Sequence, residues 1–517
     1  MYRRPLFYLV LFSSFIRLIL AYTLELGNDE VYYYTYALHL QSNYFDHPPG
    51  IAYLIKLFTA NLYFTSEIFV RLGAVFCAAI GTLLSYKIGS FINGSRTGWI
   101  AAVLYNTSIY CSIIAGTFIL PDSPQIIFWL GSLLLLLVII NKIESQRSVS
   151  TKIWILFGLI NGLCIMCKVH GIFIWGGLGL YILFYKRRML SLPGLYFSFL
   201  ITLGIISPIF FWNYSNHFVT YNYHSARVGT NHFTFDIDSL IQTIFGQWFY
   251  NGPINTVITF MGLWVCYKKK LLDNYYIRIL VLCGLPMIIV VTLMSMFNSV
   301  LPHWSGPGFL TLSFAGAVFI DNLKSRKVVK SLFPAILKCM IGFMLMLILI
   351  AIIFVNRFPG TIGNKKGEET LGETDFTLDL YGWRDFGKQF SEYYKREVGA
   401  GHLQKDLKIV SNKWFPAAHI DYYVAPLIRS YVVGIGDIND LHHYDWLNKY
   451  RGAVMSGEDA LCIIPSNYPD DALKIYGRDF TSVLPLTKFV QYRGGVICRY
   501  FFIYLLKNYI GHPDGLK

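Results

Sequence analysis

Two carboxylates stand side by side near the start of the chain, in the run Asn28-Asp29-Glu30, and a run of tyrosines follows them. An ionised carboxylate can take a proton from a hydroxyl or an amine, so the pair suits general-base chemistry. The pair also suits the first turn of a helix, with Asn28 as the N-cap and two acids complementing the helix dipole. The tyrosines are also typical of a membrane-interface belt. The residues alone leave these interpretations open.

The same connecting segment holds a second candidate group, Asp46 and His47, which two prolines follow. Each proline restricts its own backbone and that of the preceding residue, so the carboxylate and the imidazole are held in set directions. Four acids and two histidines fall within residues 25–47, and Lys56 is the first basic residue after them. Such an unbalanced cluster suits a bound cation or a hydroxyl that must lose its proton.

Four further candidates lie in later connecting segments. Asp122 begins an apolar run, where a helix cap is the alternative interpretation. Lys168 lies in a short turn between two apolar runs, where it suits a phosphate or a side chain that snorkels to the membrane surface. Arg227 and His303 lie in two later connections. A divalent cation held by Asp46 and His303 is a further possibility, although no tight metal-ligand spacing supports it.

The composition indicates the elements that position these residues. Of the 517 residues, 55% are hydrophobic and only 14% are charged, about half the charged fraction of a soluble domain. A purely soluble protein is therefore excluded. About 20 apolar residues span a bilayer as a helix, and on that template we predict about eleven transmembrane helices. They are residues 5–24, 67–92, 97–118, 124–141, 153–167, 171–185, 194–214, 247–267, 276–297, 304–320 and 332–355.

Basic residues fall in every second connection between these apolar runs. They are Arg3, Arg4, Arg96, Lys142, Arg147, Lys152, Lys186, Arg187, Arg188, Lys268, Lys269, Lys270, Lys324, Arg326, Lys327 and Lys330. The positive-inside rule then predicts a multi-pass protein with a cytoplasmic N-terminus, with the acidic and histidine-containing loops outside. An odd number of spans places the C-terminus outside too. The net charge of +14 is thus explained by membrane orientation, and nucleic acid is not an expected partner.

From about residue 356 the chain becomes more polar, and its apolar runs shorten to strand length. We predict two domains: residues 1–355, a transmembrane domain whose first outer loop (25–66) carries the site, and residues 356–517, an extracytoplasmic α/β domain. Its predicted strands are 407–411, 461–465 and 495–506, and its predicted helices are 383–396 and 417–424. The run 496–506 is too short for a membrane span and contains Arg499.

The nine cysteines are too few for a disulfide scaffold. Cys164 and Cys167 form a C-x-x-C pair, but no second pair accompanies it, so a metal or redox role is not expected. Cys462 and Cys498 lie in the polar C-terminal region. They could pair if that region faces an oxidising compartment.

The stretch Asn28–Ile55 resembles the first-loop signature of the polyprenyl-phosphate-dependent GT-C glycosyltransferases. The nearest families are the protein O-mannosyltransferases and the aminoarabinose (lipid A) transferases, glycosyltransferase families 39 and 83. Similar pieces follow in order along most of the chain: residues 121–124 with Trp129, 207–213, 303–307, 382–384 and 417–423. The resemblance implies a GT-C fold and an inverting transfer of a sugar from a lipid-phosphate donor at the outer membrane face.

The resemblance also implies roles for individual residues. The catalytic base maps onto Asp29, the first residue of the acid pair with Glu30. The phosphate- and metal-side positions of the family map onto Asp46 and His47, and Lys168 matches a family lysine at the corresponding turn. His47 stands where the aminoarabinose transferases carry a lysine, so the sequence departs from the pattern there. Donor phosphate and substrate contacts are accordingly expected from Asp46, His47, Asp122, Lys168, Arg227 and His303.

Together, the residues and the resemblance predict an inverting glycosyltransferase of the bacterial inner membrane. It would move a sugar from a polyprenyl-phosphate donor to a hydroxyl or amine of a lipid, glycan or protein on the periplasmic face. The alternatives are a lipid-linked sugar flippase or transporter, a glycan polymerase or ligase, and an inactive scaffold. Transporters place ionisable residues near the bilayer midplane and often contain inverted repeats. The sequence shows no such repeat, which favours the transferase.

Overall fold

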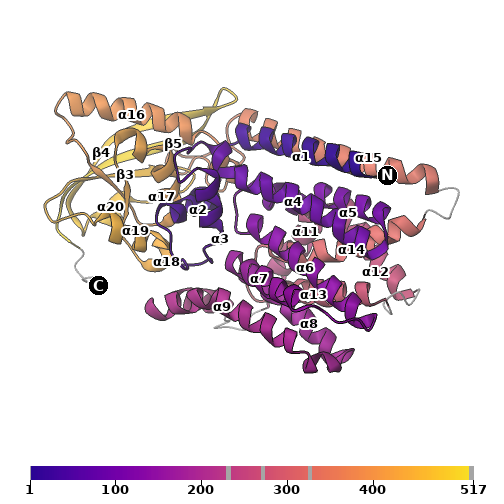
Figure 1. Cartoon of the computed structure of the whole chain (residues 1–517). Coiled ribbons are helices and arrows are strands. Elements are labelled where there is room, and N and C mark those ends of the chain that lie inside the picture. The colour runs from indigo at the N-terminus through magenta and orange to yellow at the C-terminus, as the bar shows by residue number, and fades with distance from the viewer. Residues whose placement is uncertain (1, 229–234, 269–273, 324–328, 512–517) are drawn as a thin grey trace. The chain divides into compact units, whose positions relative to one another are not determined.

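The computed structural model describes residues 2–228, 235–268, 274–323 and 329–511. The chain forms two compact units (Figure 1). The first unit comprises Met1–Ala21 and Leu40–Leu347, and the second comprises Tyr22–His39 and Ile348–Lys517. The predicted polytopic helical protein with a C-terminal α/β domain is confirmed.

The first unit is helical, and most of its helices run in roughly one direction in Figure 1. Its helices are α1 (Arg3–Thr23), α3 (Gly50–Phe58), α4 (Glu67–Asn93), α5 (Ser95–Thr107), α6 (Asp122–Glu144), α7 (Thr151–Cys167), α8 (Ile172–Phe184), α9 (Pro193–Ser215), α10 (Val219–Val228), α11 (Ile237–Tyr250), α12 (Pro253–Lys268), α13 (Tyr275–Met294), α14 (Gly306–Asn322) and the larger part of α15 (Val329–Arg357). Their core contains Trp129 on α6, whose indole N–H donates to Thr311 Oγ1 on α14 at 2.9 Å.

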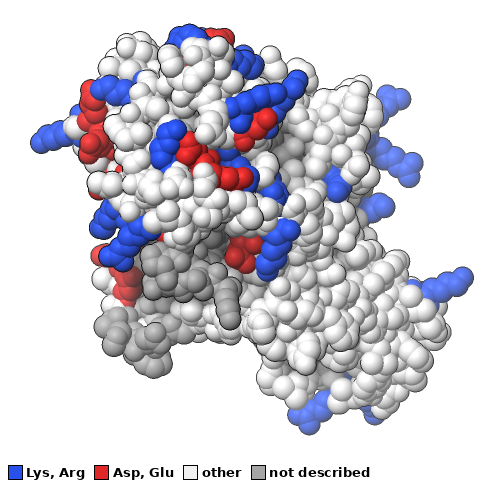
Figure 2. Space-filling model, turned by 90° about the vertical axis from the view of Figure 1, so that its left-hand side faces the viewer, with Lys and Arg blue, Asp and Glu red and all other residues white. Residues whose placement is uncertain are grey.

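Among the described residues, six helices are long and apolar enough to cross a membrane: α1, α4, α6, α9, α13 and Ala335–Arg357 of α15. Two shorter apolar helices, Thr151–Cys167 and Val169–Phe184, adjoin one another. Large apolar side chains remain exposed along α9, among them Phe199 and Phe211. In Figure 2, part of the visible surface carries both signs of charge, whereas another part is almost uncharged. The chain is therefore a multi-pass membrane protein.

Two of the predicted spans are not continuous helices. The span predicted at 97–118 is interrupted because α5 ends at Thr107 and a π-helical turn, η1 (Tyr110–Ile114), follows. Side-chain hydroxyls such as Thr107 Oγ1, which donates to Val103 O, compete with the helical pattern there. The span predicted at 247–267 is divided by Asn251 and Gly252. Gly252 has a φ of +83°, which favours glycine, and α12 begins directly after it with a proline.

The second unit contains one five-stranded mixed sheet in the order β2-β1-β3-β5-β4. The strands are β1 (Lys408–Ser411), β2 (Val432–Gly434), β3 (Ala460–Pro465), β4 (Phe480–Arg493) and β5 (Val496–Tyr509). β1 pairs in parallel with β2 and β3, whereas β5 pairs antiparallel with β3 and β4. Its helices are α2 (Asn28–Leu38), α16 (Trp383–Gly399), α17 (Trp414–Tyr423), α18 (Ile438–Leu441), α19 (Tyr444–Arg451) and α20 (Ala472–Tyr476). The run 496–506 lies in a strand, as predicted.

The predicted division at residue 355 places the segment Tyr22–His39 in the transmembrane domain. In the structure this segment belongs to the second unit. Its helix α2 packs against α17 through aromatic rings. The Tyr34 and Tyr422 ring centroids lie 4.8 Å apart, and those of Tyr32 and Trp414 lie 4.9 Å apart. Tyr32 and Tyr36 are buried, so these tyrosines are core residues of the second unit rather than the membrane-interface belt that their sequence also suggests.

Cys462 and Cys498 do not form the disulfide that an oxidising compartment would allow, because both are free and buried. Cys462 on β3 pairs with Tyr504 on β5, and Cys498 lies six residues before that position. Six residues of strand span roughly 20 Å, which is far beyond disulfide reach. Burial also raises the pKa of the Cys498 thiol to about 11, so it is protonated at neutral pH.

Candidate functional site

The acid pair lies in the first turn of α2, and its two members have different environments. Glu30 is only 2% exposed, and its Oε2 accepts the Gly27 backbone N–H at 2.9 Å. Gly27, and not Asn28 as the sequence suggests, is the N-cap residue of α2. Glu30 therefore caps the helix, whereas the Asp29 side chain is exposed. The exposed Asp29 is the better candidate of the two for a group that meets a substrate.

A buried ion pair occupies the start of α6 in the first unit. Lys168 Nζ lies 2.7 Å from Asp122 Oδ2, and the Tyr110 hydroxyl donates to Asp122 Oδ1 at 2.9 Å. Both charged side chains are at most 5% exposed. Two charges in such a place cost several kcal/mol each to desolvate, so each needs the other. The Lys168 side chain is therefore held beside Asp122 without direct access to water.

Three histidines surround this pair. His170 interacts electrostatically with Lys168, Asp122, His47 and His303. The ring of His170 lies 6.2 Å from that of Trp304, in the turn η5 (Pro302–Ser305) before α14. Burial lowers the pKa of His303 to about 4, with Asp122 acting to raise it and Lys168 acting to lower it. His303 is therefore neutral at physiological pH and can both donate and accept a hydrogen bond.

Asp46 and His47 adjoin α10. His47 Nδ1 lies 3.3 Å from Asp46 Oδ2, and His224 Nε2 donates to the Asp46 backbone carbonyl at 2.8 Å. The rings of His47 and His224 are 6.3 Å apart. Asn43 Nδ2 donates to Thr220 Oγ1 at 3.0 Å and strengthens this junction. α10 thus holds the Asp46-His47 segment in place.

Of the six predicted donor-side residues, the structure brings Asp122, Lys168, His303 and His47 within electrostatic range of one another, and Asp46 contacts His47. Arg227 lies on α10, but its side chain is outside the described residues. Asp29 and Glu30 lie in the second unit.

Sequence reasoning did not assign site roles to Tyr110, His170 or His224. Tyr110 stands in an apolar run, and only the turn η1 brings its hydroxyl to Asp122. His170 is two residues from Lys168 in the sequence, and His224 lies on α10. The sequence gives the positions of these three residues, but it does not show which residues they contact in the folded chain.

Among the described residues, no group of three or more His, Cys, Asp or Glu side chains is arranged to hold a metal ion. The predicted divalent cation at Asp46 and His303 therefore stays a prediction. The side chains that are present offer a cation and several hydrogen-bond donors. Lysine and imidazole groups suit a phosphate ester, because they donate hydrogen bonds to its oxygens.

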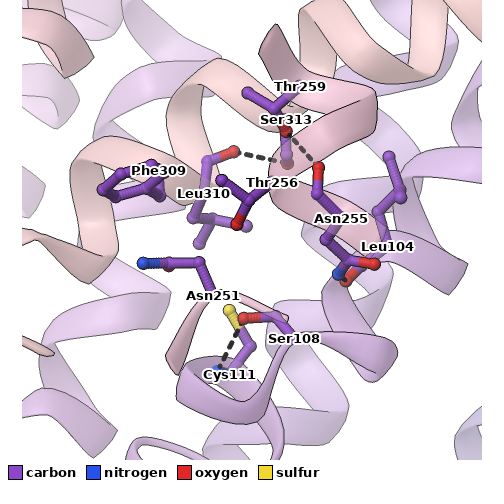
Figure 3. Close-up of a pocket in the computed structure, with 10 residues that line it drawn as sticks. All are labelled: Leu104, Ser108, Cys111, Asn251, Asn255, Thr256, Thr259, Phe309, Leu310 and Ser313. Atoms are coloured by element: carbon purple, nitrogen blue, oxygen red, sulfur yellow. Dashed lines mark hydrogen bonds between the residues drawn. The ribbon is translucent and has the colours of Figure 1, made fainter. Parts of the chain in front are cut away.

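A small cavity lies elsewhere in the first unit, between α5, α12 and α14 (Figure 3). Its volume is about 10 Å³, enough for about one water molecule. Asn255 turns towards Leu104 in Figure 3, and its Nδ2 donates to Leu104 O at 2.8 Å. None of the predicted site residues lines the cavity. It is too small for a sugar or a phosphate.

Comparison with known proteins supports the fold. Residues 46–212 match the family described as dolichyl-phosphate-mannose-protein mannosyltransferase. The apo structure of ArnT from Cupriavidus metallidurans is similar with a TM-score of 0.62 at 12% identity, covering 96% of this chain and 97% of that chain. The structure of the same protein bound to undecaprenyl phosphate is similar with a TM-score of 0.55 at 15% identity. The match covers 97% of this chain and 98% of that chain. No curated protein matches the chain in sequence.

These findings define a multi-pass membrane protein whose fold is similar to that of ArnT. This similarity agrees with the GT-C fold that the first-loop motif predicts.

Proposed function

We propose that the chain is an inverting glycosyltransferase that uses a polyprenyl-phosphate sugar as donor. The observation that supports this most is the buried Lys168–Asp122 pair with its surrounding imidazoles. A cation kept away from water by helices of a membrane unit suits a phosphate whose other end is a lipid. The undecaprenyl phosphate bound to ArnT, which shares the fold, supports this class of donor.

The reaction forms one bond and breaks one bond. A hydroxyl or amine of the acceptor attacks the anomeric carbon, and the bond from that carbon to the phosphate oxygen breaks. The lipid phosphate leaves with the bonding electrons, and the acceptor loses its proton. Attack opposite the leaving phosphate inverts the anomeric centre. We assign the proton to Asp29 on the strength of the sequence resemblance. General-base help of this kind contributes roughly 10²–10⁴-fold.

Lys168 supplies the positive charge that the leaving phosphate needs. Negative charge grows on the phosphate as the bond breaks, and a cation fixed in advance stabilises it without reorganisation. Asp122 holds the Lys168 ammonium in position, and neutral His303 supplies a further hydrogen-bond donor. We therefore assign Lys168 and His303 to the leaving group.

We further propose that the chain lies in a bacterial inner membrane, with its N-terminus in the cytoplasm and its second unit on the periplasmic side. The acceptor is then a lipid, glycan or protein of the envelope. This assignment rests on the alternation of basic connections in the sequence.

The experiment compares lipid and glycan extracts by mass spectrometry. The strains carry the wild type, a deletion, Asp29→Asn or Asp440→Asn at equal protein levels. Asp440 is an exposed acid of the second unit and serves as the matched control. We expect the deletion and Asp29→Asn strains to accumulate a lipid-phosphate monosaccharide and to lose one sugar from an envelope component. Asp440→Asn should match the wild type.

The missing mass identifies the sugar class, and the molecule that lost it is the acceptor. A defect in the deletion strain with a normal Asp29→Asn strain would contradict Asp29 as the base. A deletion strain that accumulates a lipid-linked sugar on the cytoplasmic leaflet would favour the flippase alternative.

A further inference from the structure

We infer that the second unit holds the acid-bearing start of α2 in a fixed position, and that Asp379 is the positioning residue at the centre of this clamp. The inference rests on the proposed function, in which Asp29 meets the acceptor. We use "clamp" for the contacts that Glu25, Leu26 and Asn28 make with residues of the C-terminal part of the second unit.

The first contact of the clamp is made by the residue next to Asp29. Asn28 Nδ2 donates to Asp379 Oδ2 at 3.0 Å and to the Tyr468 hydroxyl oxygen at 3.2 Å. The Tyr468 hydroxyl lies 3.0 and 3.1 Å from the two carboxylate oxygens of Asp379 and donates to that group. Asp379 lies on the short helix η7 (Phe376–Leu380), and Tyr468 follows β3. The side chains of Asn28, Asp379 and Tyr468, which lie on separate elements, are thus all hydrogen-bonded to one another.

The second contact involves the backbone of Leu26. His419 Nε2 lies 3.0 Å from Leu26 O and 2.9 Å from Asp379 O, so one N–H serves both carbonyls. The Tyr423 hydroxyl, one turn further along α17, accepts the Leu26 N–H at 2.8 Å. Burial lowers the pKa of His419 to about 3. Its imidazole is therefore neutral at physiological pH and keeps the tautomer that donates from Nε2.

The third contact is made by Glu25. Its two carboxylate oxygens accept the backbone N–H groups of Trp383 at 2.6 Å and Arg384 at 3.2 Å. These N–H groups begin α16, and the start of a helix favours an anion. The Glu25 N–H donates in turn to Leu380 O at 3.3 Å. The chain ahead of α2 is thus bound on both its side-chain and its backbone atoms.

These contacts restrict the position of Asp29. An isolated helix of eleven residues, the length of α2, is only marginally stable in water. The clamp fixes Glu25, Leu26 and Asn28, so the next residue, Asp29, has little freedom in position. A general base must lie within hydrogen-bond reach of the proton that it takes, and a displacement of about 1 Å can cost 10²-fold in rate. The second unit therefore contributes to catalysis by holding the base, in addition to any contact with an acceptor.

The test uses the full-length protein in membranes and the variants Asp379→Ala, Asp379→Asn and Tyr468→Phe. Hydrogen–deuterium exchange is followed in peptides that cover residues 25–33. We expect faster exchange there in Asp379→Ala, with unchanged exchange in β3 and β5. We expect sugar transfer in cells, read as the wild-type product, to fall at least 10-fold. Asp379→Asn keeps an acceptor oxygen for Asn28 and should retain more transfer than the alanine variant.

A binding measurement separates positioning from donor binding. The probe is undecaprenyl phosphate added to the purified protein, with bound lipid measured by native mass spectrometry. Asp379→Ala should bind it within twofold of the wild type. The double variant Asp122→Asn/Lys168→Met, which removes both charges of the buried pair and strands neither, should bind it at least 10-fold more weakly.

If Asp379→Ala fails to fold, Tyr468→Phe carries the test, because it removes one hydroxyl and keeps the ring. Normal transfer and unchanged exchange in the variants that fold would overturn the inference. That result would leave the proposed function intact if Asp29→Asn is inactive. Conversely, an active Asp29→Asn with faster exchange in Asp379→Ala would overturn the catalytic part of the inference along with Asp29 as the base.

Discussion

The Lys168–Asp122 pair shows how single residues here depend on their surroundings. Each charge is buried, and each is stable only with its partner. Tyr110 adds a hydroxyl to the carboxylate, and the neighbouring His303 stays neutral because burial lowers its pKa to about 4. The pair thus places the Lys168 amino group beside a carboxylate, a hydroxyl and neighbouring imidazoles. A phosphate that enters would meet this amino group already in place.

Asp379 gives a pH prediction at the same scale. Burial raises its pKa to about 7, and the hydrogen bonds from Tyr468 and Asn28 and the charge of Arg499 only partly oppose this effect. Between about pH 4 and pH 7 the folded chain therefore holds a proton on Asp379 that the unfolded chain has lost. The stability of the second unit should fall as the pH rises through this window.

The measurement is the apparent unfolding midpoint of the purified protein from pH 4 to pH 8, for the wild type and Asp379→Asn. We expect a smaller decline with rising pH in Asp379→Asn. Glu25, whose pKa burial also raises to about 7, acts in the same direction and remains in both proteins. His419, whose pKa is lowered to about 3, acts in the opposite direction and also remains. Parallel curves for the two proteins would contradict the prediction.

At the scale of elements, α1 secures the irregular segment between α5 and α6. Arg17 is buried on α1, and its Nη2 donates to Asn106 Oδ1 at 3.0 Å and to Ser112 Oγ at 3.2 Å. Its Nε donates to Ser112 O at 3.4 Å. Ser112 lies in the π-helical turn η1, which also carries Tyr110, the partner of Asp122. The arginine thus supports the turn that completes the ion-pair site.

Replacement of Arg17 by leucine should therefore destabilise the first unit. The change removes three hydrogen bonds to Asn106 and Ser112, each worth about 1 kcal/mol. The apparent thermal unfolding midpoint in detergent should fall by several degrees, and Arg17→Lys should lose less. Arg3→Leu, at an exposed position of the same helix, is the control. Equal midpoints for Arg17→Leu and Arg3→Leu would disprove this role.

At the scale of the whole molecule, the chain combines a membrane unit with an α/β unit that includes α2 from the N-terminal part of the chain. The proposed reaction needs the second unit on the periplasmic side. The positive-inside rule gives the same orientation, since the connection that contains Lys186, Arg187 and Arg188 is predicted to be cytoplasmic.

Reporter fusions test this orientation. Alkaline phosphatase, which is active only outside the cytoplasm, should be active when fused after residue 517 and inactive when fused after Arg188. A green fluorescent protein that folds only in the cytoplasm should give the reverse pattern. Active phosphatase at Arg188 would reverse the proposed topology and place the second unit in the cytoplasm.

Local sequence patterns were enough to predict the class of the fold. Apolar runs such as 67–92 and 276–297 predict helices because burial in lipid requires about 20 consecutive apolar residues, a signal that is local in the chain. The change of composition near residue 356 likewise predicts the C-terminal α/β region. The strands β2 and β4 were not predicted. β2 has only three residues, and β4 has a mixed burial pattern with an irregular register near Pro485.

Contacts between the candidate residues could not be predicted from the sequence and follow from the packing of the folded chain. Asp122 and Lys168 are 46 residues apart, and Asn28 and Asp379 are 351 apart. No local pattern encodes such contacts, because they depend on how helices and loops pack. The acid pair Asp29-Glu30 shows best what the sequence could not predict. Its spacing fits both a helix cap and a catalytic base, and the fold assigned capping to Glu30 while it left Asp29 exposed, because only one of two adjacent helical side chains can turn back to the Gly27 N–H.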